Sequence, residues 1–241
     1  MHIVALGSSF AAGPGIEPVL DRETGRSGRN YARLLAARLD ARLTDLSVSG
    51  ATTGSLLVDR VPPDADLVTI TAGGNDLGYV GGLVRTAVRG RLRAHRVTRP
   101  LGRRLARDAV PAVTDADVER VAAGLARVAT VARERAPRCR VVFVDYLALL
   151  GPDTRWTPAT PFEPEQVAAF RRIAERLAGA FATAAERTGA GLLRASGLSA
   201  GHALGSAQPW VTGFSLSMRP VPFHPNALGM RAVADALAGL L

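Results

Sequence analysis

Apolar residues in this chain form two kinds of pattern. Short continuous runs of Val, Ile, Leu and Ala that end in glycine or small polar residues are typical of strands buried on both faces of a sheet. Five strands are predicted, at residues 2–6, 42–48, 66–72, 140–146 and 191–194, of which 42–48 is less apolar than the others. Apolar residues at helical spacing between and after the strands predict helices at residues 31–39, 81–107, 114–135, 165–187 and 227–240. This alternation predicts an α/β fold with a parallel sheet that is covered on both faces.

The length of 241 residues fits one domain, and neither a linker nor an internal repeat divides the chain. We therefore expect a single domain over residues 1–241. The segment at about 81–112 is rich in arginine and is expected to be a helical insertion on that domain. The long irregular segment at residues 195–222 is expected to be a second insertion rather than a domain boundary.

Composition narrows the class of protein. Hydrophobic residues make up 47% and charged residues 21%, as in globular proteins, and no apolar run is long enough for a transmembrane helix. The chain opens directly on a strand without a leader-like segment, and its single cysteine, Cys139, can form no intrachain disulfide. These features predict a cytoplasmic protein, with a secreted form whose leader has been trimmed as the alternative. No cofactor is expected, because the sequence has neither a G-x-G-x-x-G loop nor a cluster of metal ligands.

The net charge of +9 comes entirely from arginine, since the chain has no lysine. Much of it falls between Arg85 and Arg107, on one predicted helical segment. A solvated outer face is the favoured interpretation of this segment. A lid, or a weak contact with an anionic membrane or polymer, is the alternative. No aromatic-interleaved basic motif accompanies the arginines, so specific nucleic-acid binding is not expected.

Candidate catalytic residues lie in four loops. Ser9, Gly50 and Asn75 each follow a predicted strand, and His224 precedes the last helix. The carboxyl ends of the strands of a doubly wound sheet open into one crevice, so these four residues are expected to meet there. A hydroxyl nucleophile, an imidazole base and hydrogen-bond donors for an oxyanion are the groups that acyl transfer requires.

On these blocks the chain resembles the SGNH hydrolases of the GDSL esterase and lipase superfamily. The matching segments are Gly7-Ser8-Ser9-Phe10, Gly50, Gly73-Gly74-Asn75-Asp76 and the block around His224. The resemblance runs from residue 3 to the last helix. It implies a three-layer α/β/α fold with a flavodoxin-like, parallel five-stranded sheet, and it implies the activity of a carboxylic ester hydrolase of the esterase or lipase type.

The resemblance also implies roles for individual residues. Ser9 would be the nucleophile that carries the acyl-enzyme, and His224 would be its general base and later its acid. The oxyanion would be held by the backbone N–H groups of Ser9 and Gly50 and by the side-chain amide of Asn75. Acyl transfer to an alcohol or sugar through the same acyl-enzyme is one alternative. A non-catalytic, arginine-rich protein that binds anionic surfaces is the other.

The chain departs from the family pattern at two positions. Ser8 stands where the family has an aspartate, which changes the hydrogen bonds of the nucleophile loop. Val221 stands where most members have the aspartate that orients the histidine. We therefore expect a dyad of Ser9 and His224, oriented by the backbone carbonyl of Val221 or Pro222, as in family members that lack this acid. Asp145, at the end of the fourth predicted strand, is a remote substitute for the acid and is expected to be structural.

The substrate is an ester or lipid ester whose acyl and alcohol parts the sequence leaves open. Phe10, His202, Trp210 and Phe214 are candidates for the walls of the substrate pocket. Ordinary packing is the more frequent role of loop aromatics. His202 is also a rival to His224 as the base.

Overall fold

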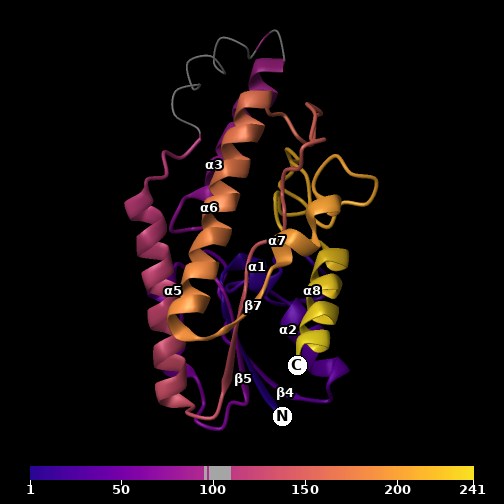
Figure 1. The fold of residues 1–241 in the computed structure, drawn as a ribbon. Helices are drawn as coiled ribbons and strands as arrows, with labels where there is room; N and C mark the ends of the chain where they lie inside the picture. Colours follow the sequence, from indigo (N-terminus) through magenta and orange to yellow (C-terminus); the bar gives the residue numbers. More distant parts are fainter. Residues whose placement is uncertain (95–96, 98–109) are drawn as a thin grey trace.

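A parallel sheet forms the centre of the computed structural model, which describes residues 1–94, 97 and 110–241 (Figure 1). Its strand order is β4-β1-β5-β6-β7, and every neighbouring pair is parallel. The strands are β1 (His2–Gly7), β4 (Arg42–Asp45), β5 (Leu67–Thr71), β6 (Arg140–Val144) and β7 (Gly191–Leu193). This order is that of flavodoxin-like sheets, so the predicted fold class is confirmed.

Helices cover both faces of this sheet. Helices α2 (Tyr31–Arg38) and α8 (Ala227–Leu240) pack together on one face, and α5 (Asp115–Arg135) and α6 (Pro164–Thr188) pack together on the other (Figure 1). Helix α3 (Tyr79–Ala94) also packs against α6. The remaining elements are short: α1 (Ser9–Ala12), α7 (Ala195–Leu198), the 3-10 helices η1 (Thr53–Ser55), η2 (Val58–Arg60) and η3 (Ala200–His202), and the hairpin of β2 (Val19–Asp21) and β3 (Arg26–Ser27).

Local sequence explains where the long helices begin and end. Thr114 and Asp117 form a reciprocal capping box at the start of α5. Pro164 occupies the first turn of α6, where its missing N–H costs nothing, and Gly189 ends that helix in a left-handed conformation. The side chain of Asn226 caps α8 by accepting from the backbone N–H groups of Leu228 and Gly229, 3.0 Å from each.

The three central strands, β1, β5 and β6, are buried on both faces, which agrees with their continuous apolar runs. Ile3, Leu6, Val68, Ile70 and Phe143 are fully buried between the helix layers. Burial of such side chains is the main source of stability in a fold of this size.

Some predicted boundaries were wrong. Strand β4 ends at Asp45 rather than at residue 48, although the N–H groups of Leu46 and Val48 still donate to the carbonyls of Ala5 and Gly7. The hairpin of β2 and β3 was not predicted, because its strands are only three and two residues long. The predicted helix at residues 81–107 corresponds to α3 up to Ala94. Within that prediction and the insertion at about 81–112, residues 95–96 and 98–109 lie outside the described residues.

The topology places two loops side by side at the carboxyl edge of the sheet. Strands β1 and β5 are neighbours, whereas the chain between them passes through β4 on the other side of β1. Such a change of direction leaves a crevice above the strand ends, where ligands of α/β sheets bind. Ser9 follows β1 and Asn75 follows β5, so both lie at this switch point.

Candidate active site

Ser9 is held at the junction of β1 and α1. The backbone N–H of Ser8 donates to the carbonyl of Thr71 on β5 at 2.8 Å, and Ser9 is the first residue of α1. A Cβ atom on Gly7 would lie 2.7 Å from the same carbonyl oxygen, so only glycine allows this close approach of the two strands. The side chain of Ser9 is thus fixed on rigid backbone, and Ser9 is 6% exposed.

Three hydrogen-bond donors belong to the loops around Ser9. Gly50 has a φ of +87°, a left-handed conformation that favours glycine. The Asn75 amide donates to the carbonyl of Ala51 at 2.8 Å, which leaves its second N–H free to bind another acceptor. In the described part of the chain, the backbone N–H groups of Ser9 and Gly50 form no hydrogen bond. Such donors could stabilise negative charge on a substrate oxygen.

Asp76 fastens the loop of Gly50 to the loop of Asn75. Its carboxylate accepts from the backbone N–H of Thr53 at 3.1 and 3.2 Å and from the Thr53 hydroxyl at 2.6 Å. Thr53 opens η1, three residues after Gly50. The hydrogen bonds of Asn75 and Asp76 therefore tie two loops together that come from different strands.

His224 is oriented by backbone rather than by a carboxylate. Its Nδ1 atom lies 2.8 Å from the carbonyl oxygen of Pro222. Because a carbonyl can only accept, Nδ1 carries the proton in the neutral ring and Nε2 presents a lone pair. The other expected carbonyl, that of Val221, accepts instead from the hydroxyl of Thr212 at 2.6 Å.

Burial lowers the pKa of His224 below 6.5, and the hydrogen bond to Pro222 offsets part of this effect. The residue is 8% exposed. The ring is therefore neutral at pH 7, which is the form that can accept a proton.

The loop that carries His224 is anchored in the core. Phe223 has a φ of +57°, an uncommon conformation for a bulky side chain, and is fully buried against Phe162, with the ring centroids 5.5 Å apart. The His224 ring in turn lies 5.6 Å from the ring of Phe10, the neighbour of Ser9. Ser9 and His224 are thus brought to the same region, although their side chains share no hydrogen bond.

The four candidate pocket residues occupy different environments. Phe10 and Phe214 are buried. Phe10 packs against Tyr146 and His224, and Phe214 stacks on Phe223. His202 and Trp210 are half-buried and stack on each other, with centroids 3.8 Å apart and planes 4° apart. Nδ1 of His202 also lies 2.9 Å from the carbonyl of Gln208. The partners of its ring are therefore Trp210 and Gln208.

Asp145 has a structural partner. Its carboxylate accepts from the backbone N–H of Ser196 at 2.8 Å and from the Ser196 hydroxyl at 2.6 Å, at the start of α7. Burial raises the pKa of Asp145, with these hydrogen bonds opposing the shift. The residue holds α7 against the end of β6 and forms no hydrogen bond with His224.

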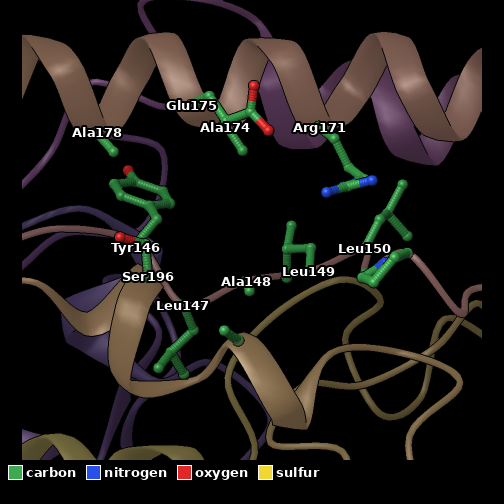
Figure 2. Close-up of a pocket in the computed structure, with 13 residues that line it drawn as sticks. Tyr146, Leu147, Ala148, Leu149, Leu150, Arg171, Ala174, Glu175, Ala178 and Ser196 are labelled. Carbon is green, nitrogen blue, oxygen red and sulfur yellow. The ribbon is translucent and has the colours of Figure 1, made fainter.

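Tyr146 is the residue that sequence reasoning missed. It is buried, its hydroxyl lies 2.9 Å from the Ser8 hydroxyl, and it accepts from the backbone N–H of Gly74 at 3.1 Å. Tyr146 also lies at one end of a cavity of about 240 Å³ between the loop at residues 146–152 and α6 (Figure 2). None of the four predicted catalytic residues lines this cavity. The only sequence signal was a tyrosine at the end of the strand predicted at residues 140–146.

The described residues contain neither a membrane-spanning helix nor a cluster of metal ligands. No helix within residues 1–94 and 110–241 is long and apolar enough to cross a bilayer. Over the same residues, no group of three or more His, Cys, Asp or Glu side chains is arranged to hold a metal ion.

Comparison with known proteins identifies the class. The model of the GDSL-like lipase/acylhydrolase family matches residues 5–232, and the chain belongs to this family. The resemblance drawn from the sequence motifs is therefore confirmed. The chain is accordingly a carboxylic ester hydrolase of the serine type.

Individual relatives agree with this assignment. Lipase 2 of Streptomyces coelicolor is 31% identical over an alignment of 265 residues, and the alignment covers 98% of this chain and 84% of that protein. The crystal structure of an extracellular lipase from Streptomyces rimosus is 26% identical and superimposes with a TM-score of 0.77 over 100% of both chains. Phospholipase A1 from Streptomyces albidoflavus, 20% identical with a TM-score of 0.80, covers 99% of this chain and 98% of its own, and shares the fold.

Proposed function

We propose that the chain cleaves carboxylic esters through an acyl-enzyme on Ser9, with His224 as general base. The observation that carries this proposal is the hydrogen bond from Nδ1 of His224 to the carbonyl of Pro222, because it leaves Nε2 free to take a proton. The contact between the rings of His224 and Phe10 supports the pairing with Ser9.

The reaction has two halves. Nε2 of His224 removes the hydroxyl proton of Ser9 while Oγ attacks the ester carbonyl carbon, and the resulting oxyanion accepts from the N–H groups of Ser9, Gly50 and Asn75. His224 then gives its proton to the leaving alkoxide, and the C–O bond breaks. Water repeats the attack on the acyl carbon, His224 again takes and returns the proton, and the carboxylic acid leaves.

The Pro222 carbonyl takes the place of the usual aspartate. It fixes the tautomer and the direction of the ring, which are two of the tasks of the acid in a triad. Because a carbonyl is uncharged, it stabilises the imidazolium less than a carboxylate would. Hydrogen bonds between catalytic groups often shorten only when substrate binds, and we expect ester binding to bring Nε2 of His224 to the Ser9 hydroxyl.

Lipid esters are the proposed substrates, since the curated relatives are named lipases. His202 and Trp210 are proposed to border the substrate site. Trp210 is joined by backbone hydrogen bonds to Asn226 and His202, next to the loop of His224. Phe10 and Phe214 would instead support the His224 loop from the core. A panel of p-nitrophenyl esters and acylglycerols graded by chain length measures the preference.

The test is an active-site comparison with matched controls. Ser9→Ala and His224→Ala are expected to lower kcat by about 10³- to 10⁶-fold, because residues of a catalytic unit act together. Ser206→Ala and His2→Ala are the matched serine and histidine controls and should retain kcat within about 10-fold, a change worth about 1.4 kcal/mol. His2 begins β1, at the opposite end of that strand from Ser9. A fluorophosphonate should label Ser9 alone, as read by mass spectrometry. Activity that survives either of the first two changes, or that is abolished by His202→Ala, would refute the assignment.

The arginine-rich segment is proposed as a weak contact with anionic membranes. Arg85 and Arg93 of α3 are exposed, as is Val88 between them, and α3 carries no acidic residue. Binding to vesicles that contain phosphatidylglycerol, lost at high salt and absent from phosphatidylcholine vesicles, would support this contact.

The cytoplasmic location stays a prediction. Since one solved relative is described as extracellular, immunodetection in culture medium and cell lysate is its test.

A further inference from the structure

The two turns that carry the proposed nucleophile and amide donor are joined by one buried side chain. The hydroxyl of Tyr146 contacts the Ser8 hydroxyl at 2.9 Å and the backbone N–H of Gly74 at 3.1 Å. Ser8 directly precedes Ser9, and Gly74 directly precedes Asn75. Tyr146 itself belongs to neither turn, since it follows β6 and lies 138 residues from Ser8.

The contact requires close complementarity. A Cβ atom on Gly74 would lie 2.7 Å from Cε1 and 2.9 Å from the hydroxyl oxygen of Tyr146, so the approach needs glycine. The N–H of Gly74 can only donate, and it therefore uses one acceptor position of the phenol oxygen. The other hydrogen-bonding positions of the phenol oxygen are available to the Ser8 hydroxyl. Ser8 is fully buried, and its hydroxyl makes no capping hydrogen bond to α1.

The ring of Tyr146 supports the same region through packing. Its centroid lies 4.2 Å from that of Phe10, which follows Ser9 and contacts the His224 ring. The Tyr146 ring also packs against the ring of Phe181 on α6, with the two centroids 6.2 Å apart. Tyr146 therefore lies between the helix layer and the two turns.

Burial raises the pKa of Tyr146 to about 12, so the phenol stays neutral over the working range of an esterase. It can act as a fixed hydrogen-bonding group but not as an acid or base in the reaction. Ser8 also stands where the GDSL motif has an aspartate. The shorter, neutral side chain of Ser8 finds its partner across the sheet in Tyr146.

We propose that Tyr146 is a positioning residue, which sets the separation between the turn of Ser9 and the turn of Asn75. This inference rests on the proposed roles of those two residues. Without the phenol hydroxyl, the two turns lose their only shared side-chain partner among the described residues. Nucleophile and oxyanion donor would then be misaligned when the carbonyl carbon is attacked, with little effect on the binding of the ester.

The variant that isolates the hydroxyl is Tyr146→Phe, which keeps the ring and its packing. We expect kcat for p-nitrophenyl butyrate to fall about 10- to 100-fold with KM within about 2-fold, because misplacement of about 1 Å can cost about 100-fold. The rate of phosphonylation of Ser9 should fall by the same factor. The acid limb of the pH profile should not move, because His224 is untouched.

Tyr31→Phe is the matched control. Tyr31 is also buried, and its hydroxyl also makes two hydrogen bonds, to Thr69 at 3.3 Å and Thr71 at 3.0 Å. Loss of a buried tyrosine hydroxyl should lower Tm in both variants, whereas only Tyr146→Phe should lose kcat. An equal loss of kcat in both variants, a change confined to KM, or unchanged kcat in Tyr146→Phe would overturn the inference.

Two further measurements keep the outcome decisive. If Tyr146→Phe does not fold, Ser8→Ala removes one of the same contacts from the other side, and it should lower kcat without raising KM. Where both variants fold, the double variant should be no slower than the slower single variant. If Ser9→Ala keeps its activity, the proposed function fails. If Ser9→Ala is inactive but Tyr146→Phe behaves as wild type, only the role of Tyr146 fails.

Discussion

Asn75 provides the sharpest test of the proposed oxyanion site. Its amide nitrogen carries two hydrogens, and one of them is held by the carbonyl of Ala51 at 2.8 Å. That bond fixes the plane of the amide and leaves the second N–H to meet the developing oxyanion. Asn75→Ala removes this donor while Ser9, Gly50 and His224 stay in place.

The expected loss in kcat is about 10²- to 10³-fold, or about 2.7–4 kcal/mol of transition-state stabilisation, as for other single oxyanion donors. The lost bond to Ala51 should also lower the free energy of unfolding by about 1 kcal/mol. The two effects separate cleanly: steady-state kinetics with p-nitrophenyl butyrate measures the first, and urea unfolding measures the second.

Thr53→Val is the control for a purely structural effect. It removes the 2.6 Å bond from the Thr53 hydroxyl to Asp76 and loosens the same pair of loops, but it removes no oxyanion donor. We expect its kcat to remain within about 10-fold of wild type, since lost side-chain hydrogen bonds cost about 1 kcal/mol each. If Asn75→Ala is no slower than Thr53→Val, Asn75 acts only by holding the loop, and the oxyanion assignment is refuted.

Two other predictions concern the histidine and its surroundings. Burial lowers the pKa of His224, and the base must be neutral, so the acid limb of the kcat/KM profile should have its midpoint below 6.5; a midpoint above 6.5 would contradict this. Asp145→Asn should leave kcat within about 3-fold of wild type, because Asp145 binds Ser196. Loss of a true triad acid would lower kcat by about 10⁴-fold, and the same kinetic assay separates the two outcomes.

The order of strands and helices could be predicted from the sequence because the central strands are continuous apolar runs and several helices have their own cap signals. Thr114 before α5 and Asn226 before α8 are examples in which local hydrogen bonds determine the start of a helix. Strand ends were less certain. The apolar pattern continues to Val48 although β4 ends at Asp45, because apolar side chains in the following loop also pack on the core.

The four proposed catalytic residues were also within reach of the sequence. Ser9, Gly50 and Asn75 follow strands whose carboxyl ends must converge in any doubly wound sheet, so their proximity follows from topology alone. The direction in which each group points does not follow from topology. Only the tertiary structure decided that the carbonyl of Pro222, rather than that of Val221, faces Nδ1 of His224, since this depends on the backbone path through the turn.

By itself, the sequence determined the fold class, the family motifs and the loops in which chemistry is expected, because these depend on periodicity and on residue type at the ends of strands. The tertiary structure alone decided the long-range partners. Tyr146 meets Ser8 across 138 residues, and Asp76 meets Thr53 across 23, through side chains whose packing no local pattern encodes. The physical reason is that hydrogen bonds between loops depend on distances of a few ångströms, which are set only when the whole sheet and its helix layers are assembled.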